Sequence, residues 1–326
     1  MDPLISVIIT VHDRTDFLKE ALESLEKQTV PKDHFEVIIV TDLDLALDKE
    51  FNLNTKIFRT PIIGTFGKDL IGIKESRGDI LCFLDDDDLF CPNKLEIMGK
   101  EFKETPGLNF YKNNTIRISE GYRFLPCSNQ EKLTKKFSSK NLSPRRIIKM
   151  KSSLNMSFNL SSISIRKRII EFDKVSQLSE SLNPDSILFF LALNSDGIIV
   201  YDGRMLSARR IRINSVSDEF GSQANRFLMS SCYTISGLLN LVDNSQVVKV
   251  LVRDKLVSKA MLFIKDRTSI DSGDIFQFVK FFILQFSPFL LLVAALGAIK
   301  LFLPKLFPFA KGIYQKYHIL FRQKFF

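Results

Sequence analysis

Four consecutive carboxylates, Asp85 to Asp88, directly follow the unbroken apolar run 80–84. A run of this length without helical alternation, lying between Gly78 and Pro92, predicts a strand that is buried on both faces. Carboxylates this close repel one another and raise one another's pKa, so the cluster requires a compensating partner. Mg²⁺ or Mn²⁺ would provide one, because these hard cations bind carboxylate oxygens together with waters and substrate phosphates. The pattern therefore predicts a divalent metal site at the end of a buried strand.

Two other interpretations of the acidic cluster remain open. A solvated acidic turn could cap a helix that starts near Pro92, which accounts for one or two carboxylates but not for four at the end of a buried strand. A phosphatase-like site would use the first Asp of Asp-x-Asp as a nucleophile. Such a site usually carries a Thr or Val soon after the motif and opens its domain. We favour the metal site over both.

The composition is that of a folded protein with anionic partners. The chain of 326 residues allows one large domain or two modest ones, and 45% hydrophobic residues exclude a disordered protein. A net charge of +9 favours nucleotide diphosphates, acidic lipid surfaces or nucleic acid as partners. Three histidines argue against a His-rich zinc site. No CxxC spacing occurs, so we expect reduced, buried thiols in a cytoplasmic setting at Cys82, Cys91, Cys127 and Cys232.

Apolar runs and helical patterns alternate over the first hundred residues, which predicts a doubly wound α/β sheet. We expect strands at 4–11, 35–40, 56–58 and 80–84, and helices within 14–28 and 64–77. Ligands of such sheets bind at the carboxyl ends of the strands, so residues 10–14, Asp42, Asp44 and the acidic cluster should converge. No GxGxxG follows the first strand, which disfavours dinucleotide binding.

Three segments resemble the family 2 glycosyltransferases of the GT-A fold. They are ISVIITVHDR at 5–14, EVIIVTD at 36–42 and FLDDDD at 83–88. The set of three in this spacing is specific to the family, and the resemblance covers roughly residues 4–217. It implies an inverting, metal-dependent enzyme that moves a sugar from a nucleotide-diphosphate donor to a hydroxyl or phosphate acceptor, either lipid-linked or a glycan.

The resemblance also implies a donor site. The first strand end contacts the nucleotide base, which points to Thr10, to His12 at a position where an aromatic ring often stacks, and to Arg14 beside them. Asp42 would hydrogen-bond the base. The family's usual Asp-Asp pair is Thr41-Asp42 here, so one carboxylate is missing.

The family's Asp-x-Asp motif falls on residues 85–87. Asp87, with help from Asp85, would hold Mg²⁺ or Mn²⁺ on the donor diphosphate, and Asp86 would lie near the ribose and the metal waters. Where the family usually has Ala-Arg-Asn-x-Gly, this chain has KDLIG at 68–72, which leaves Lys68 as the expected diphosphate contact.

Asp185 stands at the start of the apolar helical stretch 183–193, where the helix dipole stabilises an anion. Ordinary helix capping would explain that position. In the family, however, a Glu-Asp pair opens this helix and its Asp is the general base. Asp185 matches the Asp while Pro184 replaces the Glu, so Asp185 is the candidate base, with Asp173 and Glu180 as fallbacks.

The rest of the catalytic region gives weaker expectations. A strand on the acceptor side is expected at 160–165, and edge strands at 198–202 and 206–213. Arg212 stands near the place of the family's metal-binding His and would contact phosphate instead. The stretch 132–151 holds eight basic residues and no acidic one. We favour a solvated loop there over a contact with an acceptor phosphate or a lipid headgroup.

Residues 281–299 carry no charge, and Lys280 and Lys300 flank them, which is about the length that crosses a bilayer core. The tail beyond has six basic and no acidic residues, so the positive-inside rule places it in the cytoplasm. Nucleotide sugars place the catalytic domain there too, and one full span would separate the two. Pro288 near the middle favours a broken or interfacial helix, ahead of one span and of a buried soluble helix. The N-terminus shows no signal-peptide pattern.

The expected organisation is a GT-A domain at 1–217, a helical accessory region at 218–272, a membrane-associated hydrophobic segment at 273–303 and a basic aromatic tail at 304–326. The protein would be membrane-associated with its catalytic domain on the cytoplasmic side, and would not bind nucleic acid. One rival is a catalytically silent scaffold of the same fold, since Thr41, Asp69 and Arg212 depart from family motifs. The other is a basic nucleic-acid- or membrane-binding protein, which leaves the acidic cluster without a use.

Overall fold

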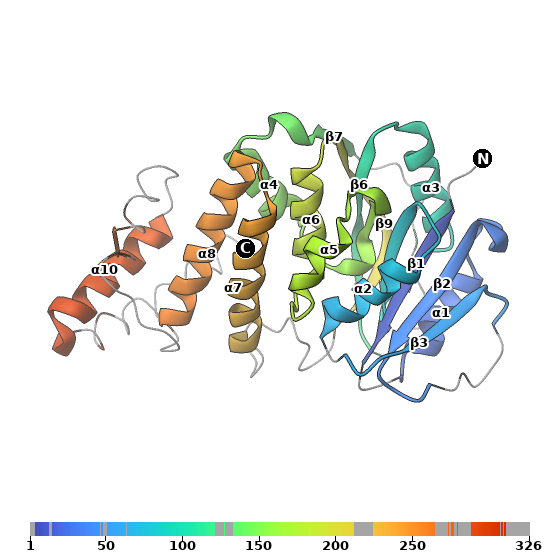
Figure 1. The fold of residues 1–326 in the computed structure, drawn as a ribbon, viewed down its shortest axis with the longest axis horizontal. Coiled ribbons are helices and arrows are strands. Elements are labelled where there is room, and N and C mark those ends of the chain that lie inside the picture. Colours follow the sequence, from blue (N-terminus) through green and yellow to red (C-terminus); the bar gives the residue numbers. More distant parts are fainter. Residues whose placement is uncertain are drawn as a thin grey trace.

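The computed structural model describes residues 4–12, 15–45, 47, 51–62, 64–120, 127, 133–211, 224–264, 273, 275–276, 279, 288–306, 308 and 310. Figure 1 shows a twisted sheet with helices on both faces, and α7, α8 and α10 extend from it in that order. The expectation of an α/β domain followed by C-terminal helices is confirmed for these residues.

The first four strands form the parallel part of the sheet. They are β1 (Ile5–Val11), β2 (Phe35–Thr41), β3 (Thr55–Arg59) and β4 (Ile80–Asp85). β1 lies between β2 and β4, and all seven residues of β1 and of β2 are buried. Runs of Ile and Val suit strands of this kind, because branched side chains pack well on a pleated surface covered on both sides.

The remaining strands are β5 (Leu89–Phe90), β6 (Leu108–Ile118), β7 (Thr134–Ser138), β8 (Ile163–Arg166) and β9 (Ile198–Arg210). They make the sheet mixed rather than mostly parallel: β6 and β9 pair in parallel, whereas β5, β7 and β8 run antiparallel to their neighbours. The strand order is β3-β2-β1-β4-β8-β6-β9-β5, and β7 also pairs with β9. β8 runs antiparallel to both β4 and β6. The two edge strands expected at 198–202 and 206–213 are one strand, β9, which lies inside the sheet.

Two cores lie on the two faces of the sheet. The helices are α1 (Leu18–Glu26), α2 (Thr65–Glu75), α3 (Lys94–Glu104), α4 (Pro144–Leu154), α5 (Phe172–Val175), α6 (Pro184–Asn194), α7 (Ala224–Leu241), α8 (Ser245–Ile264) and α10 (Pro288–Phe302). α1 and α3 cover one face, while α2, α4, α6, α7 and α8 build the larger core on the other. Successive β1 residues alternate between these cores, with Val7 and Ile9 on one side and Ile8 on the other.

The basic stretch 132–151 is not a solvated loop, so that expectation was wrong. Its described part holds β7 and α4, joined by a short turn at Ser139–Asn141. Ser143 caps α4 by accepting a hydrogen bond from a backbone N–H, and Ile147 and Met150 are buried against the core. Arg145 and Lys149 are exposed, whereas Lys151 is partly buried and pairs with Asp254 of α8, so a basic composition masked a helix that packs on the core.

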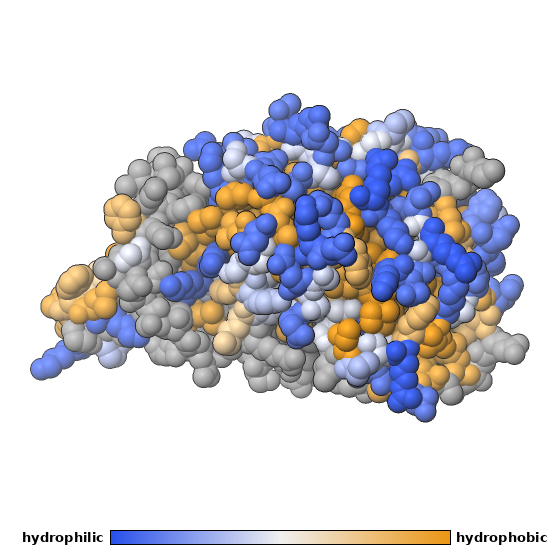
Figure 2. All heavy atoms as spheres, viewed as in Figure 1, coloured by the Kyte–Doolittle hydropathy of each residue, from blue (hydrophilic) through white to orange (hydrophobic). Residues whose placement is uncertain are grey.

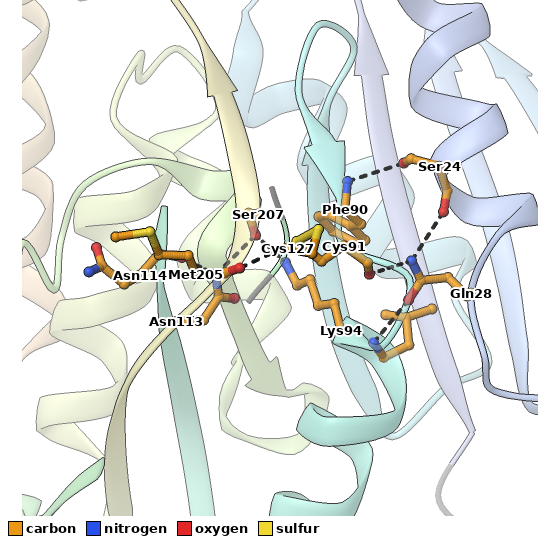
Figure 3. The surroundings of a disulfide bond; sticks show 11 residues. Ser24, Gln28, Phe90, Cys91, Lys94, Asn113, Asn114, Cys127, Met205 and Ser207 are labelled. Carbon is orange, nitrogen blue, oxygen red and sulfur yellow. Dashed lines mark hydrogen bonds between the residues drawn. A yellow bond between two sulfur atoms is a disulfide. The ribbon is translucent and has the colours of Figure 1, made fainter. Parts of the chain in front are cut away.

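The cysteines also differ from expectation. Cys91 and Cys127 form a disulfide, while Cys82 and Cys232 are free (Figure 3). Cys91 follows β5 directly, and its backbone N–H donates to the Leu206 carbonyl of β9 at 2.9 Å. The two partners are 36 residues apart and are brought together by the fold rather than by any local spacing.

The hydrophobic segment expected at 273–303 is described mainly from Pro288 onward. Within the residues that the structure describes, no helix is long and apolar enough to cross a bilayer. Apolar side chains gather on the surface over α10 and the turn after it (Figure 2). Those with large exposed fractions are Leu301, Phe302, Leu303 and Leu306.

Candidate functional site

Three strand ends lie side by side at one edge of the sheet. The register places Thr10 of β1 opposite Val40 of β2 on one side and opposite Asp85 of β4 on the other. The next pair is Val11 and Thr41. The side chains that follow these strands, from His12, Asp42 and the acidic cluster, therefore start from neighbouring positions, as the sequence predicts.

Lys68 of α2 joins the ends of β1 and β2. Its side chain is fully buried, and its ammonium donates to the Val11 carbonyl oxygen at 2.7 Å and lies 3.0 Å from His12 Nδ1. It also forms an ion pair with Asp42, whose side chain is 29% exposed. Burial pushes the pKa of Asp42 upward, but the hydrogen bond and charge of Lys68 outweigh it and hold that pKa below its usual value.

These contacts bear on two sequence predictions. Asp42 is an anion held in place and still reachable from solvent, which suits a hydrogen bond to a nucleotide base. The ammonium of Lys68 contacts groups at the ends of β1 and β2, which suits a residue that positions Asp42. A contact between Lys68 and a diphosphate stays a prediction. Arg14 lies outside the described residues.

The four carboxylates of the acidic cluster differ in their surroundings. Asp88 is buried: one carboxylate oxygen accepts from the Arg210 backbone N–H at 2.9 Å, and the other accepts from the Asn159 side-chain amide at 3.0 Å. Asp85, Asp86 and Asp87 stay partly exposed. Burial and the neighbouring charges of Asp88, Asp87 and Asp86 raise the pKa of Asp85 well above its usual value. Negative charge is thus concentrated at the end of β4.

Arg210 stabilises the turn that carries the acidic cluster. Its buried guanidinium donates to the Asp87 carbonyl oxygen at 2.9 Å and to the Glu20 carboxylate at 2.7 Å, and it stacks 4.0 Å from the Phe17 ring. The side chains of Asp85 and Asp87 take no part in these bonds. Arg210 therefore fixes the backbone of the turn.

Asp185 lies in the first turn of α6, where one of its carboxylate oxygens accepts from the Ser186 backbone N–H at 2.7 Å. Burial raises its pKa to about 6, against the opposing effects of that hydrogen bond and of the Lys112 charge. The fallback residues Asp173 and Glu180 are exposed. The surroundings of Asp185 therefore suit a general base better than those of either fallback.

Several polar side chains near the site were not expected from the sequence. Lys112 of β6 is buried, and burial together with the Lys94 charge lowers its pKa to about 7. Its ammonium donates to the Ser162 hydroxyl and to the Asn113 carbonyl oxygen at 3.3 Å. Lys94 is buried as well, and its ammonium donates to the Ser161 carbonyl oxygen at 2.5 Å. A lysine inside the buried stretch 108–113 was the available signal.

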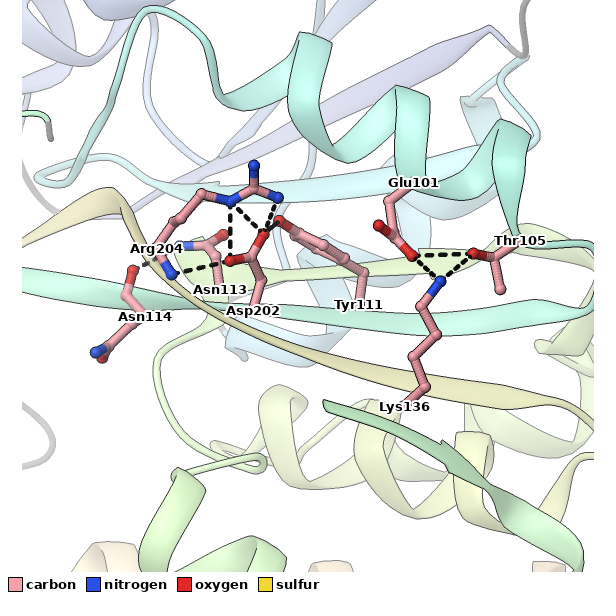
Figure 4. A network of polar contacts seen from close by, with 8 residues as sticks. All are labelled: Glu101, Thr105, Tyr111, Asn113, Asn114, Lys136, Asp202 and Arg204. Carbon is pink, nitrogen blue, oxygen red and sulfur yellow. Dashed lines mark hydrogen bonds and ion pairs between the residues drawn. The ribbon is translucent and has the colours of Figure 1, made fainter. Parts of the chain in front are cut away.

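A second polar network stabilises the sheet away from these carboxylates (Figure 4). Asp202 of β9 accepts from the Tyr111 hydroxyl at 2.6 Å and pairs with the Arg204 guanidinium at 2.5 Å. Asp202 lies opposite Asn113, next to a register shift between β6 and β9. We assign this network to the bulge rather than to ligand binding, since each group of Asp202 is already paired.

No group of three or more His, Cys, Asp or Glu side chains is arranged to hold a metal ion among the described residues. That finding is compatible with a Mg²⁺ or Mn²⁺ site of the kind that uses one or two carboxylates and completes its coordination with substrate phosphates and waters. Asp85 fits such a site, because burial and the neighbouring carboxylates raise its pKa and a bound cation would relieve that repulsion, and Asp87 lies two residues further along the same turn.

Comparisons with known proteins identify the family and the fold of this chain. The model of glycosyl transferase family 2 matches residues 6–170, just over half of the 326 residues. An uncharacterized glycosyltransferase of Haemophilus influenzae is 30% identical over 136 residues, which are 39% of this chain and 46% of that protein. The chain spans less than half the length of the curated relatives that it matches.

Two solved structures share the fold. S. aureus TarS 1-349 in complex with UDP-GlcNAc is similar over 81% of this chain and 76% of its own, with a TM-score of 0.59 and 18% identity. The mannosyltransferase PcManGT from Pyrobaculum calidifontis, in complex with GDP-Man and Mn²⁺, is similar over 96% of this chain and 87% of its own, with a TM-score of 0.53 and 10% identity. These likenesses show a GT-A-like mixed α/β fold, and with the family match they establish that the chain belongs to glycosyl transferase family 2.

Proposed function

We propose that this protein is an inverting, metal-dependent glycosyltransferase that moves a sugar from a nucleotide-diphosphate donor to a hydroxyl or phosphate acceptor. The observation that carries the proposal is the neighbouring ends of β1, β2 and β4, where Asp42 and the acidic cluster lie. Asp185 is near this edge, since its charge acts on Asp69, and the charge of Asp69 acts on Asp85. Family membership supports it, as do the UDP-GlcNAc complex of TarS and the GDP-Man complex of PcManGT.

The donor would lie across the ends of β1, β2 and β4. Its base would contact Thr10 and His12 and hydrogen-bond to Asp42, which Lys68 holds in place. Asp86 would lie near the ribose. Nucleotide bases present both donors and acceptors, so a fixed, ionised carboxylate can select among them.

Asp85 and Asp87 would hold Mg²⁺ or Mn²⁺ against the donor diphosphate. PcManGT, a protein of similar fold, was solved in complex with GDP-Man and Mn²⁺, which supports a divalent cation here. When bound, the cation would neutralise negative charge on the leaving group. Asp88 is left out of this set because the Arg210 backbone N–H and the Asn159 amide already occupy its oxygens.

Asp185 would take the proton from the acceptor hydroxyl while that oxygen attacks the anomeric carbon. Attack on the face opposite the departing diphosphate inverts the configuration at that carbon. With its pKa raised to about 6, Asp185 is ionised at neutral pH and is a stronger base than an exposed carboxylate.

A lipid-linked or glycan acceptor at a membrane surface remains part of the proposal. The exposed apolar side chains Leu301, Phe302 and Leu306 stand near Lys300 and Lys305. This combination suits a helix that lies at the interface of an anionic membrane, here the cytoplasmic leaflet. Flotation of the purified protein with anionic and with neutral vesicles would test this part.

The donor proposal is tested by calorimetry with UDP, UDP-GlcNAc, GDP and GDP-Man, each with and without Mn²⁺. We expect Mn²⁺-dependent binding of at least one donor and its nucleotide. Asp79→Asn is a matched control, since Asp79 is exposed and precedes the opposite end of β4. Binding without turnover of any donor would favour the silent-scaffold alternative, which the replacements at Thr41 and Asp69 motivate.

A further inference from the structure

Asp69 is a buried carboxylate that none of the interactions above explains. It lies in α2, next to Lys68, and is 1% exposed. Neither of its carboxylate oxygens has a hydrogen-bond partner among the described residues. Leaving a buried carboxylate unpaired is costly, so such a group in a folded protein calls for an explanation.

The packing of α2 directs Asp69 toward the catalytic carboxylates. The Phe66 backbone N–H of its first turn donates to the Ser181 carbonyl oxygen at 3.3 Å, just before α6 begins. A Cβ at Gly64 would lie 2.9 Å from the Ser179 carbonyl oxygen, so glycine permits this close approach. Consecutive helix residues point about 100° apart, and while Lys68 faces β1 and β2, Asp69 lies near Asp185 and Asp85.

This position matters because of where a donor sugar must lie. If the proposed function is correct, the transferred sugar occupies the space between the diphosphate at Asp85 and Asp87 and the base Asp185. Asp69 lies close enough to both ends of that space for the Asp185 charge to raise the pKa of Asp69, and for the Asp69 charge to raise the pKa of Asp85. Its side chain therefore borders the sugar rather than the base or the solvent.

We propose that Asp69 is a donor-specificity residue that accepts a hydrogen bond from a hydroxyl or amide N–H of the transferred sugar. This inference rests on the proposed function. It also accounts for the replacement of the family's usual Arg in the 68–72 segment by a carboxylate. A carboxylate acceptor for a sugar hydroxyl is a strong and directional interaction.

Other occupants fit less well. The ammonium of Lys112, the buried lysine that faces Asp185, is already bonded to Ser162 and Asn113. An ionised phosphate supplies only acceptor atoms, whereas a sugar supplies neutral hydroxyl donors for the two unpaired oxygens of Asp69.

The test compares nucleotide with nucleotide sugar. Calorimetry with Mn²⁺ would measure the affinities of UDP and UDP-GlcNAc, and of GDP and GDP-Man, for the parent and for Asp69→Asn, Asp69→Leu and the control Asp79→Asn. We expect Asp69→Leu to weaken the binding of the preferred nucleotide sugar by roughly 10- to 100-fold, as befits the loss of a hydrogen bond to a charged group, with nucleotide affinity unchanged. The nucleotide-sugar affinity of Asp69→Asn, which keeps one acceptor oxygen, should lie between those of the parent and of Asp69→Leu.

Each outcome decides something. If the parent binds none of the four ligands, the proposed function fails and the inference fails with it. If the parent binds a donor but Asp69→Leu leaves the ratio of sugar-nucleotide to nucleotide affinity unchanged, or weakens both ligands equally, the inference alone is overturned. Misfolding is judged from thermal unfolding, where removal of an unpaired buried carboxylate should leave Tm at or above the parent value. If Asp69→Leu does not fold, the ratio measured with Asp69→Asn decides.

Discussion

The substitution Lys68→Met tests how the ends of β1 and β2 are held together. It removes an ammonium that contacts the Val11 carbonyl, His12 and Asp42 and replaces it with an apolar chain of similar length. A fully buried ion pair that loses one partner costs about 3–5 kcal/mol of stability. Asp42 is 29% exposed and keeps part of its hydration, so we expect a loss of only about 2 kcal/mol.

Thermal unfolding measures this loss. For a domain of about 200 residues, about 2 kcal/mol corresponds to a Tm decrease of roughly 4–8 °C. Lys140→Met is a matched control, because the ion pair of Lys140 with Asp196 is exposed at both ends and should contribute under about 1 kcal/mol. Nucleotide affinity should also fall, by about tenfold, since Asp42 loses the bond that orients it.

The Tm difference between the parent and Lys68→Met should depend on pH in a defined direction. The pKa of Asp42 lies below its usual value in the folded protein. Its pairing with Lys68 therefore stabilises the protein above the ordinary Asp pKa, and the contribution is lost as the pH falls through the lowered folded pKa. The Tm difference between parent and Lys68→Met should be full at neutral pH and shrink in acid. A difference of under about 1 °C at neutral pH, or one that grows in acid, would refute the reasoning.

Three further predictions concern the acidic cluster, Asp185 and the disulfide. Asp87→Asn should abolish the metal-dependent part of nucleotide binding in calorimetry. The Tm without ligand should stay the same or rise, because the substitution removes repulsion within the acidic cluster. If the variant binds nucleotide with metal as tightly as the parent, Asp87 is not a metal ligand. Asp185→Asn should lower turnover by about 10²–10⁴-fold with donor affinity unchanged. The turnover of the parent should decrease as the pH is lowered through about 6, because Asp185 then takes up a proton. A pH-independent rate would contradict its role as the base. Replacing Cys91 and Cys127 by alanine should lower stability in denaturant unfolding by about 3–4 kcal/mol, the entropic value for a loop of 36 residues, and an unchanged midpoint would contradict the disulfide.

The parallel half of the sheet was predictable because its signals are local. An apolar run bounded by a turn and followed by charged residues specifies a buried strand and its end, and β1, β2 and β4 lie within a residue or two of the expected positions. The nearness of Thr10 and Asp85 then follows from parallel pairing. The comparisons confirm the family that these segments resemble.

The mixed part of the sheet, β5 to β9, was less predictable because its strands carry buried polar residues. β6 contains Asn109, Lys112 and Asn113, all buried, and these interrupt the apolar pattern from which a strand is usually inferred. Their partners lie on β8, β9 and the turn before β8, far away in sequence. Pairings of that kind depend on tertiary packing, which no local pattern encodes.

Asp69 shows the same limit within the site. A Lys-Asp pair in the middle of a helical pattern is typical of a solvated face, and the neighbouring glycines give no direction. Only the packing of α2 on β1 and against the segment before α6 shows that Lys68 and Asp69 are both buried. Lys68 contacts the ends of β1 and β2, whereas Asp69 lies near Asp85 and Asp185. Disulfide pairing was hidden for the same reason.

The bonds of Arg210 and Asp88 have a consequence for the energetics of ligand capture. They fix the backbone of the acidic turn from the protein side, through Asp87, Glu20 and Asn159. Ordering a flexible segment costs roughly 1–2 kcal/mol per residue, and a ligand that must impose this order loses affinity accordingly. Here the order exists before any cation or diphosphate arrives. Free energy of binding can therefore go into discrimination between ligands, and the backbone of the turn should superpose in the free and bound proteins.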